Sequence, residues 1–360
     1  MIPFATPQTP FLALEMPAFE RNIKRMAETI VVTGGKRWRP HVKAIKTPAL
    51  VHRLIAGGAR GVTCAKLSEA EVMVGAGIDD VLIANQVVGS AKVKLLAELN
   101  RTARVIVAID APAHLQPLVE AAAAAGVVIP IMVEVDVGLR RAGVTPGAAV
   151  VELAHLIRER PQLEFVGVMA WEGHTASIAD PSEKETQVKA AVECLLASAR
   201  ACVAAGISVG TVSCGGTGTY EITSTIAEVT EIQAGGGVFG DVRYRDELHV
   251  NLECALTLQT TVISRPNARR IVCDAGWKAT GRYPTLPVAL DTEGVQAIVL
   301  SAEHASIELE RASERPQVGE FMRLAVGYSD STVFLHDVIY GMRDGAIEQG
   351  WPVAGRGKLW

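Results

Sequence analysis

The stretch RVIVAIDAPAHLQPLVEAAAAAGVVIPIMVEVD, from Arg104 to Asp136, decides the fold. Two runs rich in β-branched residues, Arg104–Asp110 and Val127–Asp136, enclose a longer amphipathic segment. Strands that alternate with such segments are typical of parallel β-α-β units. The pattern therefore predicts a strand, a covering helix and a second strand parallel to the first.

The same alternation extends in both directions, from about Asn22 to Tyr244. Eight such units fit a (β/α)8 TIM barrel better than an open doubly wound sheet. We therefore predict an α/β fold with a barrel over residues 15–245, and a long helix over residues 182–205 that Gly206 ends. The predicted strands are Arg37–Lys43, Gly61–Cys64, Asp80–Ala84, Arg104–Asp110, Val127–Asp136, Phe165–Trp171, Gly210–Cys214 and Val229–Ala234.

After about Arg245 the pattern changes to alternating runs such as Ala255–Ile263 and Arg270–Cys273, separated by Pro, Asn and Gly. These runs predict a mostly antiparallel β-domain. The segment Pro10–Leu14 is a candidate for one more strand of this domain. We assign residues 1–14 and 246–360 to it.

The composition excludes several classes of protein. The chain of 360 residues is 49% hydrophobic and carries a net charge of -4 without a basic stripe, so we expect a packed core and no nucleic-acid partner. Its longest apolar stretch, Ala121–Val133, is too short to span a membrane, and its start lacks the order of a signal peptide, so we expect a cytoplasmic protein. The six cysteines show no C-x-x-C spacing, which argues against a zinc knuckle or a disulfide framework.

Lys43 ends the first predicted strand, in Arg39-Pro-His-Val-Lys43, which would place it at the mouth of the barrel. A lysine in that position can bond covalently to a carbonyl cofactor. Two alternatives remain open: Lys43 is an exposed lysine at the start of a loop, or Lys46 is the reactive lysine.

Two glycine-rich segments, CGGTGT from Cys214 and QAGGG from Gln233, follow the seventh and eighth predicted strands. Many barrels bind phosphate on backbone amides at these two strand ends, although two tight turns would read the same way. Neither segment matches a nucleotide-binding motif. A lysine opposite two phosphate-type loops meets the needs of pyridoxal 5'-phosphate (PLP), which has an aldehyde at one end and a phosphate at the other. The candidate residues for this part of the site are Gly216, Thr217, Gly218, Gln233, Gly235 and Gly236.

The fifth and sixth strand ends carry further polar residues. Arg141 is a candidate donor to an anionic oxygen of the cofactor, or else part of a surface ion pair. The sixth strand leads into Trp171-Glu172-Gly-His174. If Glu172 faced a pyridine nitrogen, it would keep that nitrogen protonated and strengthen the ring as an electron sink. Alternatively, Trp171 only closes the rim of the barrel.

Short motifs spread over nearly the whole chain carry a resemblance to a known family. They are Thr9–Leu12, Arg39–Lys43, Leu67–Glu71, Asp136–Val144, Gly215–Thr219, Asp274–Gly276, Glu303–His304, Leu335–Asp337 and Trp351–Gly357. Their order and spacing resemble the D-threonine aldolases, D-3-hydroxyaspartate aldolases and D-serine dehydratases, whose fold is similar to alanine racemase and is called fold type III.

The resemblance implies that Lys43 is the lysine that bonds to PLP. It also implies that amides around Gly216–Gly218 and Gly235–Gly236 hold the phosphate, and that Arg141 lies beside the cofactor ring. The family forms homodimers in which the β-domain of one subunit completes the active site of the other. The β-domain residues that this would involve are Asp274, Glu303, His304 and the segment near Asp330.

Two departures from the family matter. Members usually carry His-Cys-Asp or His-x-Cys ahead of the Leu-His-Asp motif, and those residues bind a divalent metal. This chain has Tyr328-Ser329-Asp330 instead, and a protonated tyrosine is a poor ligand for zinc or manganese. We therefore expect either no metal or a weakly held Mg²⁺ on Asp330. Trp171-Glu172 also replaces the usual Tyr-Gln or Tyr-His.

The leading hypothesis is a PLP-dependent lyase, an aldolase that cleaves a D-configured β-hydroxy amino acid into glycine and an aldehyde or keto acid. His174 and Tyr328 are candidates for the base that removes the β-hydroxyl proton. Dehydration, racemisation and transamination by the same cofactor are rival reactions. A cofactor-binding protein without turnover is a further rival, against which the C-terminal β-domain counts.

Overall fold

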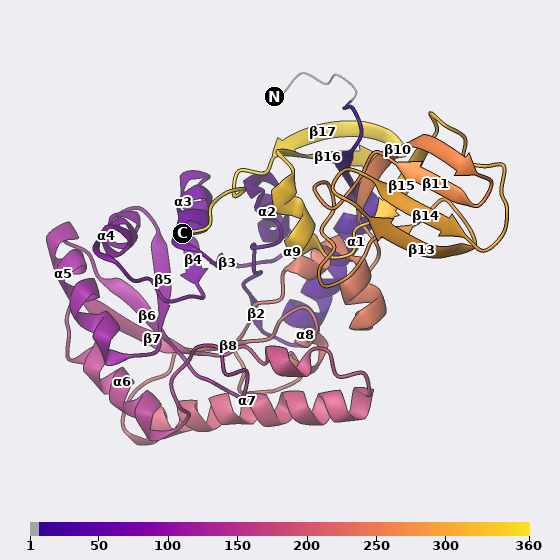
Figure 1. Ribbon diagram of the computed structural model, residues 1–360. Coiled ribbons are helices and arrows are strands. Elements are labelled where there is room, and N and C mark those ends of the chain that lie inside the picture. The colour runs from indigo at the N-terminus through magenta and orange to yellow at the C-terminus, as the bar shows by residue number, and fades with distance from the viewer. Residues whose placement is uncertain (1–6) are drawn as a thin grey trace. The chain divides into compact units, whose positions relative to one another are not determined.

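The computed structural model describes residues 7–360 and contains two compact units (Figure 1). The barrel unit comprises residues 26–43, 51–235 and 358–360, and the sheet unit comprises residues 7–25, 44–50 and 236–357. Residues 1–6 lie outside the described residues. They belong to the start of the chain, where we expect no signal peptide, and to the segment 1–14 that we assign to the β-domain. The division at 15–245 and 246–360 stays a proposal.

Eight parallel strands form the barrel unit, in the order β2-β9-β8-β7-β6-β5-β4-β3. The ring closes beyond β2, where His41 forms a parallel bridge to Thr63 and the Val42 amide donates to the Thr63 carbonyl at 2.8 Å. The predicted TIM-type barrel is confirmed. The strands are β2 (Arg37–Trp38), β3 (Val62–Cys64), β4 (Asp80–Ile83), β5 (Arg104–Ile109), β6 (Ile129–Glu134), β7 (Leu163–Met169), β8 (Thr211–Cys214) and β9 (Glu231–Ile232).

The first strand is shorter than predicted. We expected Arg37–Lys43, whereas β2 ends at Trp38 and only His41 bridges a neighbour further on. Pro40 explains the break, because proline has no amide proton to donate to a strand ladder. Lys43 therefore lies in a turn two residues after the bridge.

Helices α3 to α7 flank the strands of the barrel unit in Figure 1. The longest, α7, matches the predicted range to within one residue at each end. Asp180 caps its start by accepting a hydrogen bond from the Glu183 amide, and Gly206 follows its end at a φ of 78°. The helices from α2 onward are α2 (Pro48–Ala56), α3 (Leu67–Gly75), α4 (Ser90–Leu99), α5 (Leu115–Ala125), α6 (Ala148–Arg158), α7 (Pro181–Ala204) and α8 (Tyr220–Thr223).

The described part of the sheet unit holds one nine-stranded, mostly antiparallel sheet, as predicted. The candidate strand near the N-terminus is confirmed as β1, which pairs antiparallel with β10 and parallel with β16. In the sequence, helix α1 (Met16–Ala27) directly follows β1, and helix α9 (Ser329–Thr332) lies between β15 and β16. The strands are β1 (Phe11–Glu15), β10 (Leu256–Asn267), β11 (Arg270–Cys273), β12 (Val288–Ala289), β13 (Val295–Leu300), β14 (Ala305–Leu309), β15 (Phe321–Ala325), β16 (Val338–Arg343) and β17 (Ala346–Pro352).

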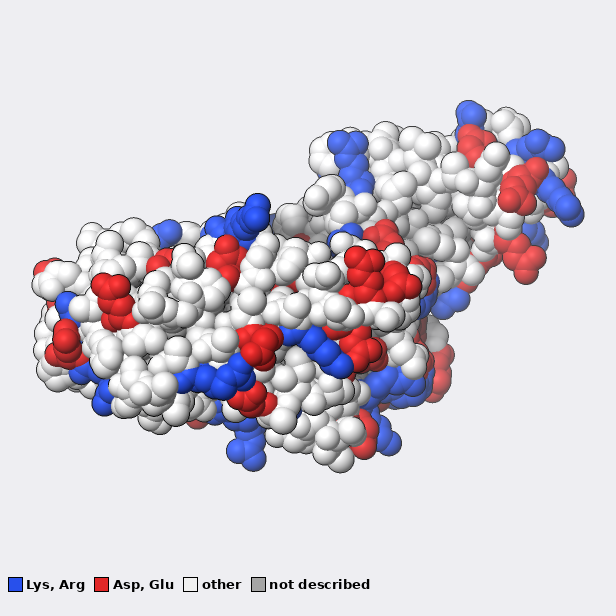
Figure 2. Space-filling view, turned by 90° about the horizontal axis from the view of Figure 1, so that it is seen from below, with Lys and Arg blue, Asp and Glu red and all other residues white. Residues whose placement is uncertain are grey.

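Basic and acidic side chains are interspersed on the face seen in Figure 2. Several form pairs at the surface, such as Arg104 with Glu164 and Lys189 with Glu185. All six cysteines are free, and the four that are buried pack as small core residues. Within residues 7–360, none of the helices is both long and apolar enough to cross a membrane.

A chain of buried polar contacts runs through the interior of the barrel and joins four strands. The Arg39 guanidinium contacts Glu231 at 2.9 Å, with both side chains at most 4% exposed, and it donates twice to Asp80 at 2.8 and 3.0 Å. Ser213 donates to Glu231 at 2.9 Å and accepts from Gln233 at 3.0 Å. Because buried charges need partners, this network holds the strands next to Lys43 in register.

Replacing Glu231 by glutamine should lower the free energy of unfolding by about 3 kcal/mol, because it leaves the Arg39 charge buried beside a neutral group. Urea denaturation followed by circular dichroism measures the change. The matched control is Glu164→Gln, which removes a half-exposed partner of Arg104 and should cost less than about 1 kcal/mol. Equal losses in the two variants would contradict the structural importance of the buried pair.

Candidate active site

The predicted cofactor residues follow five consecutive strands of the ring, in the order β2, β9, β8, β7 and β6. Because all strands are parallel, the segments that follow them emerge at the same rim of the barrel. The chain order hides this arrangement, since β9 is the last barrel strand in sequence but pairs with β2, the first. The five segments along the arc contain Lys43, Gln233–Gly235, Gly215–Thr219, Trp171–His174 and Arg141.

The two candidate lysines differ in accessibility. Lys43 is exposed, and its backbone amide lies 3.3 Å from His41 Nδ1. Lys46 is only 7% exposed, has a φ of 52°, and accepts a hydrogen bond from the Gly355 amide on its own carbonyl oxygen. The geometry thus favours Lys43 as the reactive lysine.

The segment after β8 forms a tight turn that leads into α8. The amides of Thr219 and Tyr220 both donate to the Gly216 carbonyl, at 3.0 and 2.9 Å. Thr217 and Gly218 lie within this turn and are buried. Gly215 has a φ of 81°, a conformation that favours glycine. We call residues 215–219 the glycine loop.

Trp171 lies directly against the glycine loop. A Cβ atom at Gly216 would fall 2.2 Å from Cη2 of the Trp171 indole, and one at Gly173 would fall 2.3 Å from its Nε1. The ring therefore needs a glycine at both positions. Trp171 thus does more than close the rim, because it packs on the backbone that is predicted to hold a phosphate.

The segment after β9 is in contact with the backbone that leads to Lys43. A Cβ atom at Gly235 would fall 2.2 Å from the His41 carbonyl oxygen, so only glycine allows this approach. The Gln233 amide donates to the Cys214 carbonyl at 3.1 Å, while its side chain points to Ser213. Gly236 belongs to the sheet unit.

Glu172 is fully buried, and both of its carboxyl oxygens contact the glycine loop. Thr219 Oγ1 donates to Oε1 at 2.6 Å, and the Gly215 amide donates to Oε2 at 3.3 Å. Burial raises the pKa of the Glu172 carboxyl, and the hydrogen bonds from Thr219 and Gly215 oppose that rise. Glu172 therefore has a candidate role at the loop besides the one predicted at the cofactor ring.

Arg141 has a buried acidic partner that the sequence interpretation did not assign. Its Nη2 lies 3.6 Å from Oε1 of Glu134, whose side chain is 4% exposed and also accepts from Gln86 at 2.6 Å. Burial raises the pKa of Glu134, against the effects of Gln86 and Arg141. The Arg141 side chain itself is 57% exposed, so the pair joins an exposed guanidinium to a buried carboxyl group. In the sequence, the only indication of this contact is that Arg141 and Glu134 belong to the same short segment, Glu134–Gly143.

His174 is exposed and borders the segment that carries Arg141. Its Nε2 would lie 3.0 Å from a Cβ atom at Gly138. Nearby, Asp136 accepts hydrogen bonds from the amides of Arg140 and Gly138, both at 3.0 Å. The Arg140 amide first of all, and the charge of His174 to a lesser degree, lower the pKa of Asp136.

Tyr328 and Asp330 lie in the sheet unit, at the start of α9. The Tyr328 ring packs 5.9 Å from the Tyr244 ring, and the Arg243 guanidinium lies 5.5 Å from its centroid. Asp241 accepts from the amide and the hydroxyl of Ser329, at 2.8 and 2.6 Å. Burial raises the pKa of Asp241 to about 7. A cation over the Tyr328 ring is an unfavourable neighbour for a metal ion.

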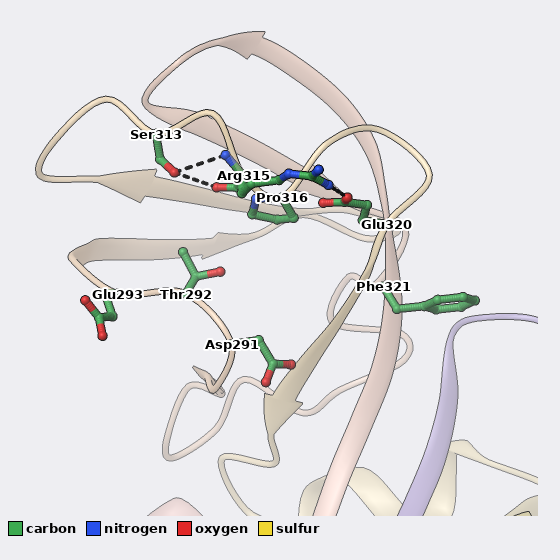
Figure 3. A pocket seen from close by; sticks show the side chains of 8 residues that line it. All are labelled: Asp291, Thr292, Glu293, Ser313, Arg315, Pro316, Glu320 and Phe321. Carbon is green, nitrogen blue, oxygen red and sulfur yellow. Dashed lines mark hydrogen bonds and ion pairs between the residues drawn. The ribbon is translucent and has the colours of Figure 1, made fainter. Parts of the chain in front are cut away.

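A hollow of about 390 Å³ lies elsewhere in the sheet unit (Figure 3). Arg315 and Glu320 form an ion pair in its wall, and Asp291 is paired with Arg323. The hollow contains none of the predicted site residues. Its lining consists of Asp291, Thr292, Glu293, Ser313, Arg315, Pro316, Glu320 and Phe321.

Comparison with known proteins shows the family of this chain. Residues 14–243 match the family model described as "Alanine racemase, N-terminal domain", and residues 255–342 match the "Putative serine dehydratase domain". The D-threonine aldolase of Arthrobacter sp. is 34% identical over 99% of this chain and 94% of its own length. This chain belongs to the D-threonine aldolase family of alanine-racemase-like proteins.

Two further comparisons extend over nearly the whole chain. The 3-hydroxy-D-aspartate aldolase of Paracoccus denitrificans strain Pd 1222 is 35% identical, over 98% of this chain and 92% of its own. The crystal structure of D-threonine aldolase from Filomicrobium marinum superposes with a TM-score of 0.94 at 35% identity, covering 98% of this chain and 97% of that one. The barrel and the β-sheet therefore occur together in members of this family.

Replacing Gly216 by alanine should destabilise the barrel by about 2 kcal/mol, because the new methyl group would overlap the Trp171 indole. Thermal melting measures the loss. In a Trp171→Ala background the same Gly216→Ala change should cost less, since the smaller side chain gives the methyl group room. Gly75→Ala is the matched control, because no atom lies within 4 Å of its Cβ position, and it should not destabilise the protein. An unchanged melting temperature for Gly216→Ala would contradict the contact.

Proposed function

We propose that this chain is a PLP-dependent lyase that cleaves the Cα–Cβ bond of a D-configured β-hydroxy amino acid. The products are glycine, or a small amino acid, and an aldehyde or keto acid. The observation that carries the proposal is the exposed Lys43 in the turn that follows β2, next in the ring to the glycine segments that follow β9 and β8. Membership of the D-threonine aldolase family supports the reaction type.

The residues of the arc fit the two ends of PLP. Lys43 supplies the amine for the aldehyde, and the glycine loop with Gly235 supplies closely approachable backbone for the phosphate. When bound, the cofactor supplies an electron sink for the bond that breaks. Arg141, which pairs with Glu134, would donate to an anionic oxygen beside the ring.

Proton transfer requires a group near the substrate hydroxyl. His174 is exposed at the end of β7 and is a candidate base for the β-hydroxyl proton. Tyr328 is a second candidate, and its ring is positioned by Tyr244 and Arg243. With the cofactor bound, Lys43 would be the group that holds or returns the proton at Cα.

The metal that the family resemblance implies does not fit the residues present. Within residues 7–360, no group of three or more His, Cys, Asp or Glu side chains could hold a metal ion. Tyr328 stands where the family has histidine, and Arg243 lies over its ring. We therefore propose a reaction without a tightly held transition metal, in which Asp330 binds Mg²⁺ weakly or not at all.

Dehydration is the second candidate function, because residues 255–342 match a putative serine dehydratase domain. The products distinguish the reactions: ammonia and a keto acid indicate dehydration, and a change of chirality alone indicates racemisation. A keto acid together with an aminated cofactor would indicate transamination. The homodimer and the cytoplasmic location stay proposals, and a cofactor-binding protein without turnover stays the alternative.

Replacing Lys43 by alanine should abolish both cofactor attachment and cleavage of D-threonine or D-3-hydroxyaspartate. Borohydride reduction followed by peptide mapping should place the label on Lys43 in the wild-type protein, and assays for glycine and aldehyde should detect turnover. Lys46→Ala is the matched control and should keep the label. A label on Lys46, or no bound cofactor, would refute the proposed function.

Dialysis against a chelator should reduce the rate of cleavage by less than about twofold, because the residues at Tyr328–Asp330 do not form a tight metal site. The measurement compares the initial rate before dialysis, after dialysis, and after addition of Mg²⁺, Mn²⁺ or Zn²⁺. A loss of most activity that Mn²⁺ or Zn²⁺ restores would show that the metal site was wrongly excluded.

A further inference from the structure

Glu172 occupies an unusual position for an acidic residue. Its side chain is completely buried, and burial and hydrogen bonds from neutral groups act on its pKa. A buried carboxyl group is costly unless its oxygens are hydrogen-bonded. The glycine loop donates two of these hydrogen bonds, and the backbone of Glu172 itself contributes another.

The contacts tie together both ends of the loop. Oε2 receives the amide of Gly215, the first loop residue, and Oε1 receives the hydroxyl of Thr219, the last. The same hydroxyl oxygen accepts the Gly216 amide at 3.1 Å. One carboxyl group from the segment after β7 thus holds together two residues that lie four positions apart on the segment after β8.

The backbone of Glu172 is itself held in place. Its carbonyl oxygen accepts from Thr175 twice, from the hydroxyl at 2.7 Å and from the amide at 3.0 Å. The indole ring of the preceding residue, Trp171, packs on Gly216. The Trp171–Thr175 segment therefore forms a rigid support for the glycine loop.

We propose that Glu172 is a positioning residue for phosphate binding: it acts through Thr219 and Gly215 on the loop, and not on the electronics of the cofactor ring. The proposal rests on the proposed function, because it assumes that the loop receives the phosphate of PLP. It predicts that loss of the Glu172–Thr219 contact weakens only ligands that carry a phosphate.

The test compares the binding of PLP with that of pyridoxal, which lacks the phosphate. Apoprotein is titrated with each vitamer, and the absorbance of the protein-bound vitamer gives the dissociation constant. Glu172→Leu and Thr219→Val should each raise the dissociation constant for PLP about tenfold, the effect of one buried charge-assisted hydrogen bond. The dissociation constant for pyridoxal should change by less than about twofold.

Three further variants sharpen the result. The double variant Glu172→Leu/Thr219→Val should bind PLP no more weakly than Glu172→Leu alone, because both changes remove the same contact. Thr225→Val, in an exposed turn nearby, is the matched control and should leave both constants unchanged. Glu172→Gln keeps the shape of the side chain, and the pH at which the bound cofactor changes its absorbance should stay at the wild-type value.

Opposite results would overturn the proposal. If Glu172→Leu weakens pyridoxal as much as PLP, or if Glu172→Gln shifts the absorbance titration, Glu172 acts on the ring. If Thr219→Val, the milder change, leaves PLP affinity intact, the loop contact is not used. Wild-type protein that binds neither vitamer would instead refute the proposed function, so the two failures are distinguishable.

Discussion

The pairing of β9 with β2 is the constraint on which the rest of the site depends. It brings the last strand of the barrel beside the first and, with the bridge from His41 to Thr63, closes the ring. Closure places the turn that carries Lys43 against the backbone of Gly235, at a distance that only glycine allows. The lysine proposed to react and the segments proposed to bind phosphate are neighbours for this reason.

Buried acids hold polar partners at three points of the barrel unit. Glu231 holds Arg39 below the lysine turn, Glu134 holds Arg141, and Glu172 holds the glycine loop. Each of these carboxyl groups is costly to bury, so each is acceptable only because specific donors reach it. Each carboxyl group in turn restrains the groups that donate to it or pair with it. Among them, Arg141 and the glycine loop belong to the predicted site.

Much of the candidate site could be predicted because its residue types are unusual where they occur. A lysine after the first strand and glycine runs after the last two strands stand out in a barrel pattern. The directions of the side chains could not be predicted in the same way. Glu172 reads equally well as a partner of a cofactor ring and as a buried acid, and only the contacts with Thr219 and Gly215 show what it touches.

The sequence by itself determined the order of strands and helices, the long helix α7 and the family, because these follow from local hydrophobic periodicity and from motif spacing. Tertiary structure alone decided that Lys43 lies in a turn, since Pro40 ends the ladder early, and that Arg39 pairs with Glu231. Such contacts join residues about 190 positions apart, and their energy depends on burial that no local pattern records.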